Sequence, residues 1–257
     1  MKILAVGDIV GSAGVNELKS NLKQIQEKEN IDFTIVNGEN SAEGMGITEK
    51  NFKDIISSGA DVVTMGNHTW GKKEIFKFID DPKLIRPANY PEGVLGKGYS
   101  IYECKDKKIA VINLIGRVDM NVLSENPFLK ALQIIQKIES KVDMIFVDFH
   151  AEATAEKIAM GYYLDGKVTA VYGTHTHVQT ADEKILPNGT GYITDIGMTG
   201  PAHSVIGMNI GASIKRFETT LPEKYKIAEG KCILNGVIFE VEDNAFKVKN
   251  IKRIYIK

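Results

Sequence analysis

Side chains of the types that bind metal ions follow short apolar runs at five places in this sequence. The residues concerned are Asp8, Glu39, Asn40, Asn67, His68, His150, His175 and His177. In an open α/β sheet, ligands bind beyond the carboxyl ends of the strands, where loops offer side chains without breaking the ladder of hydrogen bonds. The pattern therefore predicts a metal centre that is assembled from strand ends.

The two histidines of Gly173-Thr174-His175-Thr176-His177 favour a pair of metal ions. If this segment is extended, both imidazoles point to the same side, with their Cα atoms roughly 6.6 Å apart. That spacing suits two neighbouring ions. A helical His-Glu-x-x-His pair would instead place both rings on one ion, and the sequence contains no such motif.

Two neighbouring ions need a bridging ligand, and Glu39 is the candidate. A carboxylate can give one oxygen to each ion and hold the ions about 3.5 to 4 Å apart. Asp8 would bind the first ion, and the amide oxygens of Asn40 and Asn67 could complete one ion each. Mixed nitrogen and oxygen ligation argues against a thiolate-bound zinc site, but iron, manganese and zinc all remain compatible with it.

His68 follows Asn67 directly in the sequence. Adjacent side chains diverge in direction, so we expect the His68 imidazole to face the substrate rather than the ions. Histidine changes its charge near neutral pH, and an imidazole that binds no metal can protonate a departing alkoxide. We therefore predict that His68 is a general acid.

The elements that would carry these residues alternate between strand and helix in the first third of the chain. Apolar periodicity and capping residues predict strands over 2–6, 33–36 and 62–64, and helices over 15–28 and 48–58. This alternation predicts a parallel arrangement for the first strands.

The rest of the chain adds a hairpin, further alternating elements and a tail that is mostly strand. The hairpin joins 99–103 to 109–112, and the tail has strands over 232–241 and 246–255 after a helix over 212–218. Between them, helices are predicted over 127–139 and 153–163 and strands over 144–148 and 168–172. We expect an α/β fold in which two mixed sheets pack together with helices outside.

Composition favours one domain over residues 1–257, because no linker or charge block divides the chain and the candidate ligands run from Asp8 to His177. The formal net charge of −1 argues against a basic face for long nucleic acid, although a small nucleotide remains possible. Cys104 and Cys232 lie far apart in the sequence, which fits buried, reduced thiols in a cytoplasmic protein. The N-terminal apolar run is too short for a signal peptide and no segment approaches transmembrane length, so we expect no membrane partner.

The motifs Gly7-Asp8, Gly38-Glu39-Asn40, Gly66-Asn67-His68, His150 and Gly173-Thr174-His175-Thr176-His177 resemble those of the calcineurin-like metallophosphoesterases. Two departures matter, because Val10 stands where that family usually has a histidine and Glu39 where it usually has an aspartate. With these two departures, the motifs resemble those of the YmdB-type subfamily of bacterial phosphodiesterases, which act on 2′,3′-cyclic nucleotides. Gly71 and the segments 115–118 and 195–201 extend this similarity over most of the chain.

The resemblance implies a four-layer αββα sandwich, a dinuclear site often occupied by iron, and a homo-oligomer. It places Asp8, Glu39, Asn40 and His177 on the first ion, and Glu39, Asn67, His150 and His175 on the second. It implies hydrolysis of 2′,3′-cyclic nucleotides to 3′-monophosphates. In that reaction, a hydroxide activated by two metal ions would attack phosphorus in line, and His68 would protonate the leaving oxygen.

Other interpretations stay open. The same motifs fit a broader phosphodiesterase or phosphomonoesterase of small phosphate esters, and a regulatory protein that binds a nucleotide as a signal and hydrolyses it incidentally. Asp8 or Glu39 alone could cap a helix, and the glycines of 7–14 are interpreted as turn residues because a dinucleotide-loop pattern is absent. Arg117 is a candidate contact for the substrate phosphate, to which its planar guanidinium is suited.

Overall fold

The computed structural model of this chain describes residues 1–224, 226–242 and 247–257. Its first sheet consists of β1 (Lys2–Val6), β2 (Asp8–Ile9), β3 (Phe33–Asn37), β4 (Val62–Thr64), β5 (Leu84–Ile85), β12 (Met198–Pro201), β13 (Cys232–Val241) and β14 (Val248–Ile256). The strand order is β2-β12-β13-β1-β3-β4-β5, and β14 pairs with β13. Strands β1, β3, β4 and β5 run parallel, as the sequence predicts, while β13 is antiparallel to β1.

The second sheet consists of β6 (Tyr99–Cys104), β7 (Lys107–Ile115), β8 (Met144–His150), β9 (Ala170–Thr174), β10 (Lys184–Ile185) and β11 (Gly191–Ile193). Its strand order is β10-β11-β9-β8-β7-β6. Strands β6 and β7 form the predicted antiparallel hairpin, and β7, β8, β9 and β11 run parallel. Both sheets are therefore mixed, as expected.

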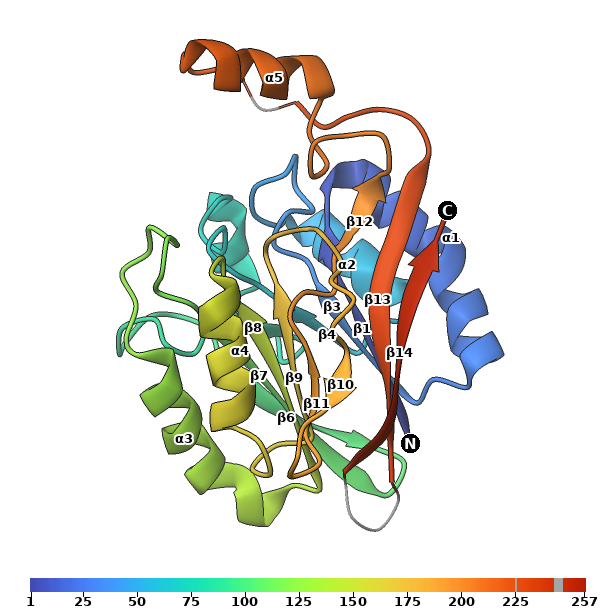
Figure 1. Ribbon diagram of the computed structural model, residues 1–257, viewed down its shortest axis with the longest axis vertical. Helices are drawn as coiled ribbons and strands as arrows, with labels where there is room; N and C mark the ends of the chain where they lie inside the picture. The colour runs from blue at the N-terminus through green and yellow to red at the C-terminus, as the bar shows by residue number, and fades with distance from the viewer. Residues whose placement is uncertain (225, 243–246) are drawn as a thin grey trace.

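Side chains alternate between the two faces of each strand, and this alternation builds the layers. In β1, Leu4 and Val6 face α1 (Gly11–Glu29) and α2 (Glu49–Ser57), while Ile3 and Ala5 face the second sheet. The far face of the second sheet packs on α3 (Pro127–Ile138) and α4 (Thr154–Tyr163). Figure 1 shows the two sheets between these helix pairs, so the αββα sandwich is confirmed.

Helix α5 (Ile210–Thr219) stands apart from these layers. It lies between β12 and β13 in the sequence, has no buried residue, and projects beyond the body of the molecule (Figure 1). Short 3₁₀ helices lie at Lys73–Lys77 and Glu139–Lys141. No helix within the described part of the chain is long and apolar enough to span a membrane.

Several boundaries differ from those predicted. Helix α1 begins at Gly11 rather than near Val15. Its first turn packs closely on β12 at Gly14, where an added Cβ would lie 2.3 Å from the Thr199 carbonyl oxygen. The short strands β2, β5, β10, β11 and β12 were not predicted, since two to four residues carry little periodicity. Position 246, where the last strand was predicted to begin, lies outside the described residues, and β14 begins at Val248. Both cysteines are free thiols, and they are partly exposed rather than buried.

Candidate metal centre

The predicted ligands come from both sheets and meet at one end of the sandwich. Asp8, Glu39, Asn40 and Asn67 lie on or just after strands of the first sheet, and His150, His175 and His177 on or just after strands of the second. Asp8 follows β1, as the sequence suggested, and is also the first residue of the short strand β2. Hydrogen-bond distances link these seven residues, so the structure brings the predicted ligands together.

Three of them converge on the Nε2 atom of a fourth, His150, which is fully buried. This nitrogen lies 3.0 Å from Glu39 Oε1, 2.9 Å from Asn67 Oδ1 and 3.0 Å from His175 Nδ1. The ligand atoms of Glu39, His150 and His175 all lie within 4.8 Å of one another. A carboxylate oxygen, an amide oxygen and two imidazole nitrogens are mixed donors of the kind that bind iron, manganese or zinc.

Asp8, Asn40 and His177 form the second part of the site. Asp8 Oδ2 accepts a hydrogen bond from the His175 backbone N–H at 3.1 Å, while Asp8 Oδ1 is buried and has no hydrogen-bond partner among the described residues. The Asn40 amide group lies 3.0 Å from His177 Nε2 and 3.2 Å from Glu39 Oε1. Half a turn of this carboxamide would present its oxygen instead of its nitrogen. An unpartnered buried carboxylate oxygen is a place that a cation would satisfy.

Each of the three histidines is anchored through the ring nitrogen that faces away from the site. His150 Nδ1 lies 2.9 Å from Thr174 Oγ1, His175 Nε2 lies 3.2 Å from Glu152 Oε2, and His177 Nδ1 lies 2.9 Å from the Ile206 carbonyl oxygen. A carboxylate and a carbonyl only accept hydrogen bonds, so His175 and His177 donate outward and keep a lone pair directed inward. Such outer hydrogen bonds orient histidines that bind metals.

Thr174 fixes the third ring through Asp148. The Thr174 hydroxyl lies 2.7 Å from Asp148 Oδ1, and the buried Asp148 carboxylate also accepts hydrogen bonds from Thr64 and Asn37. The single hydroxyl hydrogen is donated to Asp148, so Thr174 accepts the Nδ1–H of His150. The Nε2 lone pair of His150 is thereby free to face Glu39 and Asn67, and the donor set fits a metal ion.

Electrostatics in the protein without metal favour a positive charge at the same place. Burial would raise the pKa of Glu39, but His150 and His68 lower it to about 2. Burial would lower the pKa of His150, but the Glu39 and Asp8 carboxylates raise it to about 9. Burial, together with His150, lowers the pKa of His175 to about 3. A bound cation would replace the proton of His150 and would neutralise the buried carboxylates.

The loop that carries His175 and His177 is not extended, so the condition under which the sequence placed both imidazoles on one side is not met. His175 has φ +102° and His177 has φ +65°, a region that L-residues rarely adopt. Thr176 lies between them, and both its N–H and its hydroxyl donate to Asp195 Oδ2, at 3.1 and 2.8 Å. Asp195 in turn forms a buried ion pair with Lys157 at 2.7 Å. This pair holds the turn from beneath.

His68 lies beside this cluster but in a different setting. It is half-buried, its backbone N–H donates to Glu39 Oε2 at 3.1 Å, and it lines an open cavity of about 360 Å³. Glu39, Asn40, His175 and His177 form part of the same cavity, as do Met45, Ile206 and Met208. An imidazole at this position can exchange protons with a molecule in the cavity.

Arg117 is not among the described residues that line this cavity. It is exposed, and its backbone N–H donates to Glu156 at 3.0 Å. Its contact with substrate stays a prediction that its position does not support. Sequence reasoning did not identify Asp148, Thr174 or Lys157. An acid within the apolar run of β8 was the one signal that pointed to Asp148.

The sandwich and its cluster of histidines, acids and amides define a protein of the metallophosphoesterase fold. The NAD nucleotidase of Haemophilus influenzae shares this fold with a TM-score of 0.64 and 13% identity, over 99% of this chain and 55% of that chain. The family described as YmdB-like protein matches residues 4–254, and this chain belongs to it.

Closer relatives match the chain over its whole length. A protein of Bacillus subtilis (strain 168), named 2′,3′-cyclic-nucleotide 2′-phosphodiesterase, is 53% identical over 100% of this chain and 97% of its own length. A crystal structure described as a novel phosphatase of Mycoplasma pneumoniae has a TM-score of 0.94 and 40% identity, over 100% of this chain and 93% of that chain. A hypothetical protein of Thermus thermophilus has a TM-score of 0.94 and 35% identity, over 99% of this chain and 98% of that chain.

Proposed function

We propose that this chain is a metal-dependent phosphodiesterase that hydrolyses cyclic nucleotides, with 2′,3′-cyclic nucleotides converted to 3′-monophosphates. The observation that carries the proposal is the convergence of Glu39, Asn67 and His175 on His150 Nε2 at the floor of a cavity that His68 also lines. The activity for which the Bacillus subtilis relative is named, at 53% identity, supports the choice of substrate.

Two groups of contacts support the ligand set that the family resemblance implies. Asp8, Glu39, Asn40 and His177 would hold one ion, and Glu39, Asn67, His150 and His175 the other, with Glu39 shared. When bound, the ions supply positive charge that acidifies an attacking water and neutralises charge on the phosphate. Iron is the metal we propose, with manganese and zinc as alternatives, and metal analysis of the purified protein distinguishes them.

His68 is proposed to donate a proton to the departing 2′ oxygen. It lines the cavity, and no contact places its ring nitrogens against an acidic side chain among the described residues. Its backbone N–H holds Glu39, so a change of side chain leaves that contact in place. Proton donation to a leaving alkoxide contributes about 10² to 10⁴ in rate.

The test is a product assay with metal-reconstituted protein on 2′,3′-cyclic and 3′,5′-cyclic AMP. We expect release of 3′-AMP from the first and far slower turnover of the second. His68→Ala should bind the same amount of metal and lose at least about a hundredfold in kcat. His203→Ala, which alters an exposed histidine outside the cavity, is the matched control and should keep full activity.

Three results would contradict this proposal. Near-normal turnover by His68→Ala at neutral pH would remove the proton-donor role. Comparable hydrolysis of many phosphate monoesters would favour a broad phosphoesterase. Tight nucleotide binding without turnover would favour a protein that senses nucleotides.

The cytoplasmic location, the single domain over residues 1–257 and the homo-oligomer also remain proposals. Exposed apolar side chains on and beside α5, namely Ile214, Phe217 and Leu221, are compatible with contacts between subunits. Light scattering coupled to size-exclusion chromatography measures the oligomer directly.

A further inference from the structure

The tight turn at Val205–Met208 contains an unusual residue. Val205 and Met208 exchange two backbone hydrogen bonds of 2.9 Å each, and the two residues between them have φ +48° at Ile206 and φ +97° at Gly207. Two-residue turns with positive φ at both central positions favour glycine, asparagine and aspartate. A β-branched side chain in this region is a genuine outlier and is conformationally costly.

The backbone of this turn has a function that needs no particular side chain. The Ile206 carbonyl oxygen accepts the Nδ1–H of His177 at 2.9 Å and so orients that ring. Glycine or asparagine at position 206 would supply the same carbonyl at a lower conformational cost. The Ile206 side chain is also 48% exposed, so core packing does not explain why isoleucine stands there.

The side chain belongs to an apolar rim, which we define as Met45, Ile206 and Met208. All three residues line the cavity above Glu39 and His177, and Met45 is 41% exposed. Met208 packs against the loop that carries Met45, because a Cβ on Gly44 would lie 2.9 Å from Met208 Cε. The floor of the cavity is therefore polar and one of its walls is apolar.

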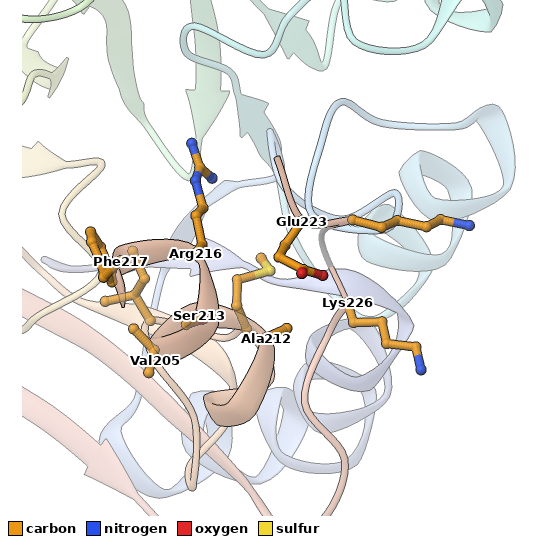
Figure 2. Close-up of a pocket in the computed structure, with 10 residues that line it drawn as sticks. Val205, Ala212, Ser213, Arg216, Phe217, Glu223 and Lys226 are labelled. Atoms are coloured by element: carbon orange, nitrogen blue, oxygen red, sulfur yellow. The ribbon is translucent and has the colours of Figure 1, made fainter. Parts of the chain in front are cut away.

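The rim also borders a second cavity, which lies beneath α5. Val205 and Phe217 lie on one side of this cavity, and Glu223 and Lys226 lie on the other (Figure 2). Ile206 and Met208 line both cavities, so they separate the candidate metal centre from the space beneath α5. The Ile206 side chain therefore borders the space beside the candidate metal ligands.

We propose that Ile206 is a specificity-determining residue and that the apolar rim receives the nucleobase of the substrate. This inference rests on the proposed function. The phosphate of a cyclic nucleotide would occupy the polar floor, and the flat apolar faces of its base require an apolar surface beside that floor. Isoleucine at 206 supplies this surface, and its strained backbone is the cost of placing it there.

The test compares Ile206→Asn with the unchanged protein, both loaded with Mn²⁺. Calorimetry should show roughly tenfold weaker binding of 3′-AMP and unchanged binding of inorganic phosphate, which has no base. The KM for 2′,3′-cyclic AMP should rise by a similar factor while kcat stays within about twofold. Mn²⁺ affinity should be unchanged, and the unfolding midpoint should rise by roughly 2–5 °C as strain is relieved.

Ile206→Gly repeats the measurement with another residue that accepts positive φ. Thr220→Gly is the matched control, because Thr220 is also β-branched, with φ +58°, but lies at the end of α5 outside both cavities. It should raise the unfolding midpoint without changing nucleotide binding.

Equal binding of 3′-AMP by Ile206→Asn, Ile206→Gly and the unchanged protein would overturn the role of Ile206. A similar loss of phosphate binding would also overturn it, because the effect would then lie in the metal centre. If the unchanged protein failed to turn over 2′,3′-cyclic AMP, the proposed function would fail, while the comparison of 3′-AMP with phosphate would still decide the role of Ile206.

Discussion

Replacing Thr174 with valine removes one hydroxyl and keeps the shape of the side chain. That hydroxyl lies 2.7 Å from Asp148 Oδ1 and 2.9 Å from His150 Nδ1. Asp148 keeps its hydrogen bonds from Thr64 and Asn37 at Oδ2, but its Oδ1 loses the Thr174 donor, and His150 Nδ1 loses its acceptor. Without the hydroxyl, the ring can release its Nδ1 proton and keep the Nε2 proton directed at Glu39 Oε1, 3.0 Å away. A metal ion can bind His150 Nε2 only after this proton has moved away from Nε2.

The size of the effect follows from the hydrogen bond that the metal-bound ring then lacks. A buried N–H without an acceptor costs about 1–3 kcal/mol, and loss of an outer hydrogen bond to a metal-binding histidine lowers affinity roughly 10- to 100-fold. We therefore expect Thr174→Val to weaken Mn²⁺ binding by about that factor. Competition calorimetry measures the affinity, and ¹⁵N chemical shifts of the histidine rings report which nitrogen of His150 carries the proton.

Two variants separate orientation of the ring from general damage. Thr174→Ser keeps the hydroxyl and should bind Mn²⁺ within about threefold of the unchanged protein. Thr64→Val removes a hydrogen bond to the same Asp148 carboxylate, so it should lower stability without a comparable loss of affinity. Unchanged Mn²⁺ affinity in Thr174→Val, or equal losses in Thr174→Val and Thr64→Val, would refute this account of how His150 is oriented.

Three further predictions concern stability. Lys157→Met should lower the midpoint of thermal unfolding by roughly 10 °C, because it leaves Asp195 buried without its cation. The double variant Lys157→Met/Asp195→Asn should recover part of this loss, and no recovery would argue against the ion pair. Chelation of bound metal should lower the unfolding midpoint, because the buried Asp8 and Glu39 carboxylates then lack their cations, and added Mn²⁺ should restore it. An unfolding midpoint that does not respond to chelator would count against a metal centre. Burial opposes ionisation of Asp32, but Lys105 and the Lys2 N–H lower its pKa below the usual value. The ionised Asp32 carboxylate therefore stabilises the folded protein at neutral pH, and this contribution is lost as the pH falls through the lowered pKa. Asp32→Asn should thus destabilise the protein at pH 7, and its effect should shrink steadily as the pH falls below the ordinary aspartate pKa of about 3.9, as urea unfolding over a pH series would show.

The sequence correctly predicted that the candidate ligands lie together, because each one stands beside an apolar run that is easily recognised as a strand. It predicted the local backbone less well. The spacing argument for His175 and His177 depended on an extended loop, but both residues have positive φ, and Thr176 between them donates hydrogen bonds to Asp195, which is distant in the sequence. The strand β2, which begins at Asp8, was not predicted because a two-residue strand has no periodicity of its own.

The partners of the ligands were harder to predict than the ligands. Thr174 reaches His150 because β8 and β9 pair in a parallel register that sets these two residues side by side. Parallel strands are joined by a long crossover rather than a short turn, so spacing along the chain does not reveal which residues lie opposite each other. Ile206 was overlooked for a related reason, since a backbone carbonyl that anchors His177 leaves no trace in residue type.

The division of the candidate ligands between the two sheets follows their chemistry. Each oxygen donor, from Asp8, Glu39, Asn40 and Asn67, belongs to the first sheet, and each imidazole, from His150, His175 and His177, belongs to the second. Neither sheet alone offers a mixed donor set, so tight metal capture would have to follow the docking of the two sheets during folding. Once bound, the ions would cross-link the two sheets, and separating the sheets would require breaking metal–ligand bonds as well as apolar contacts.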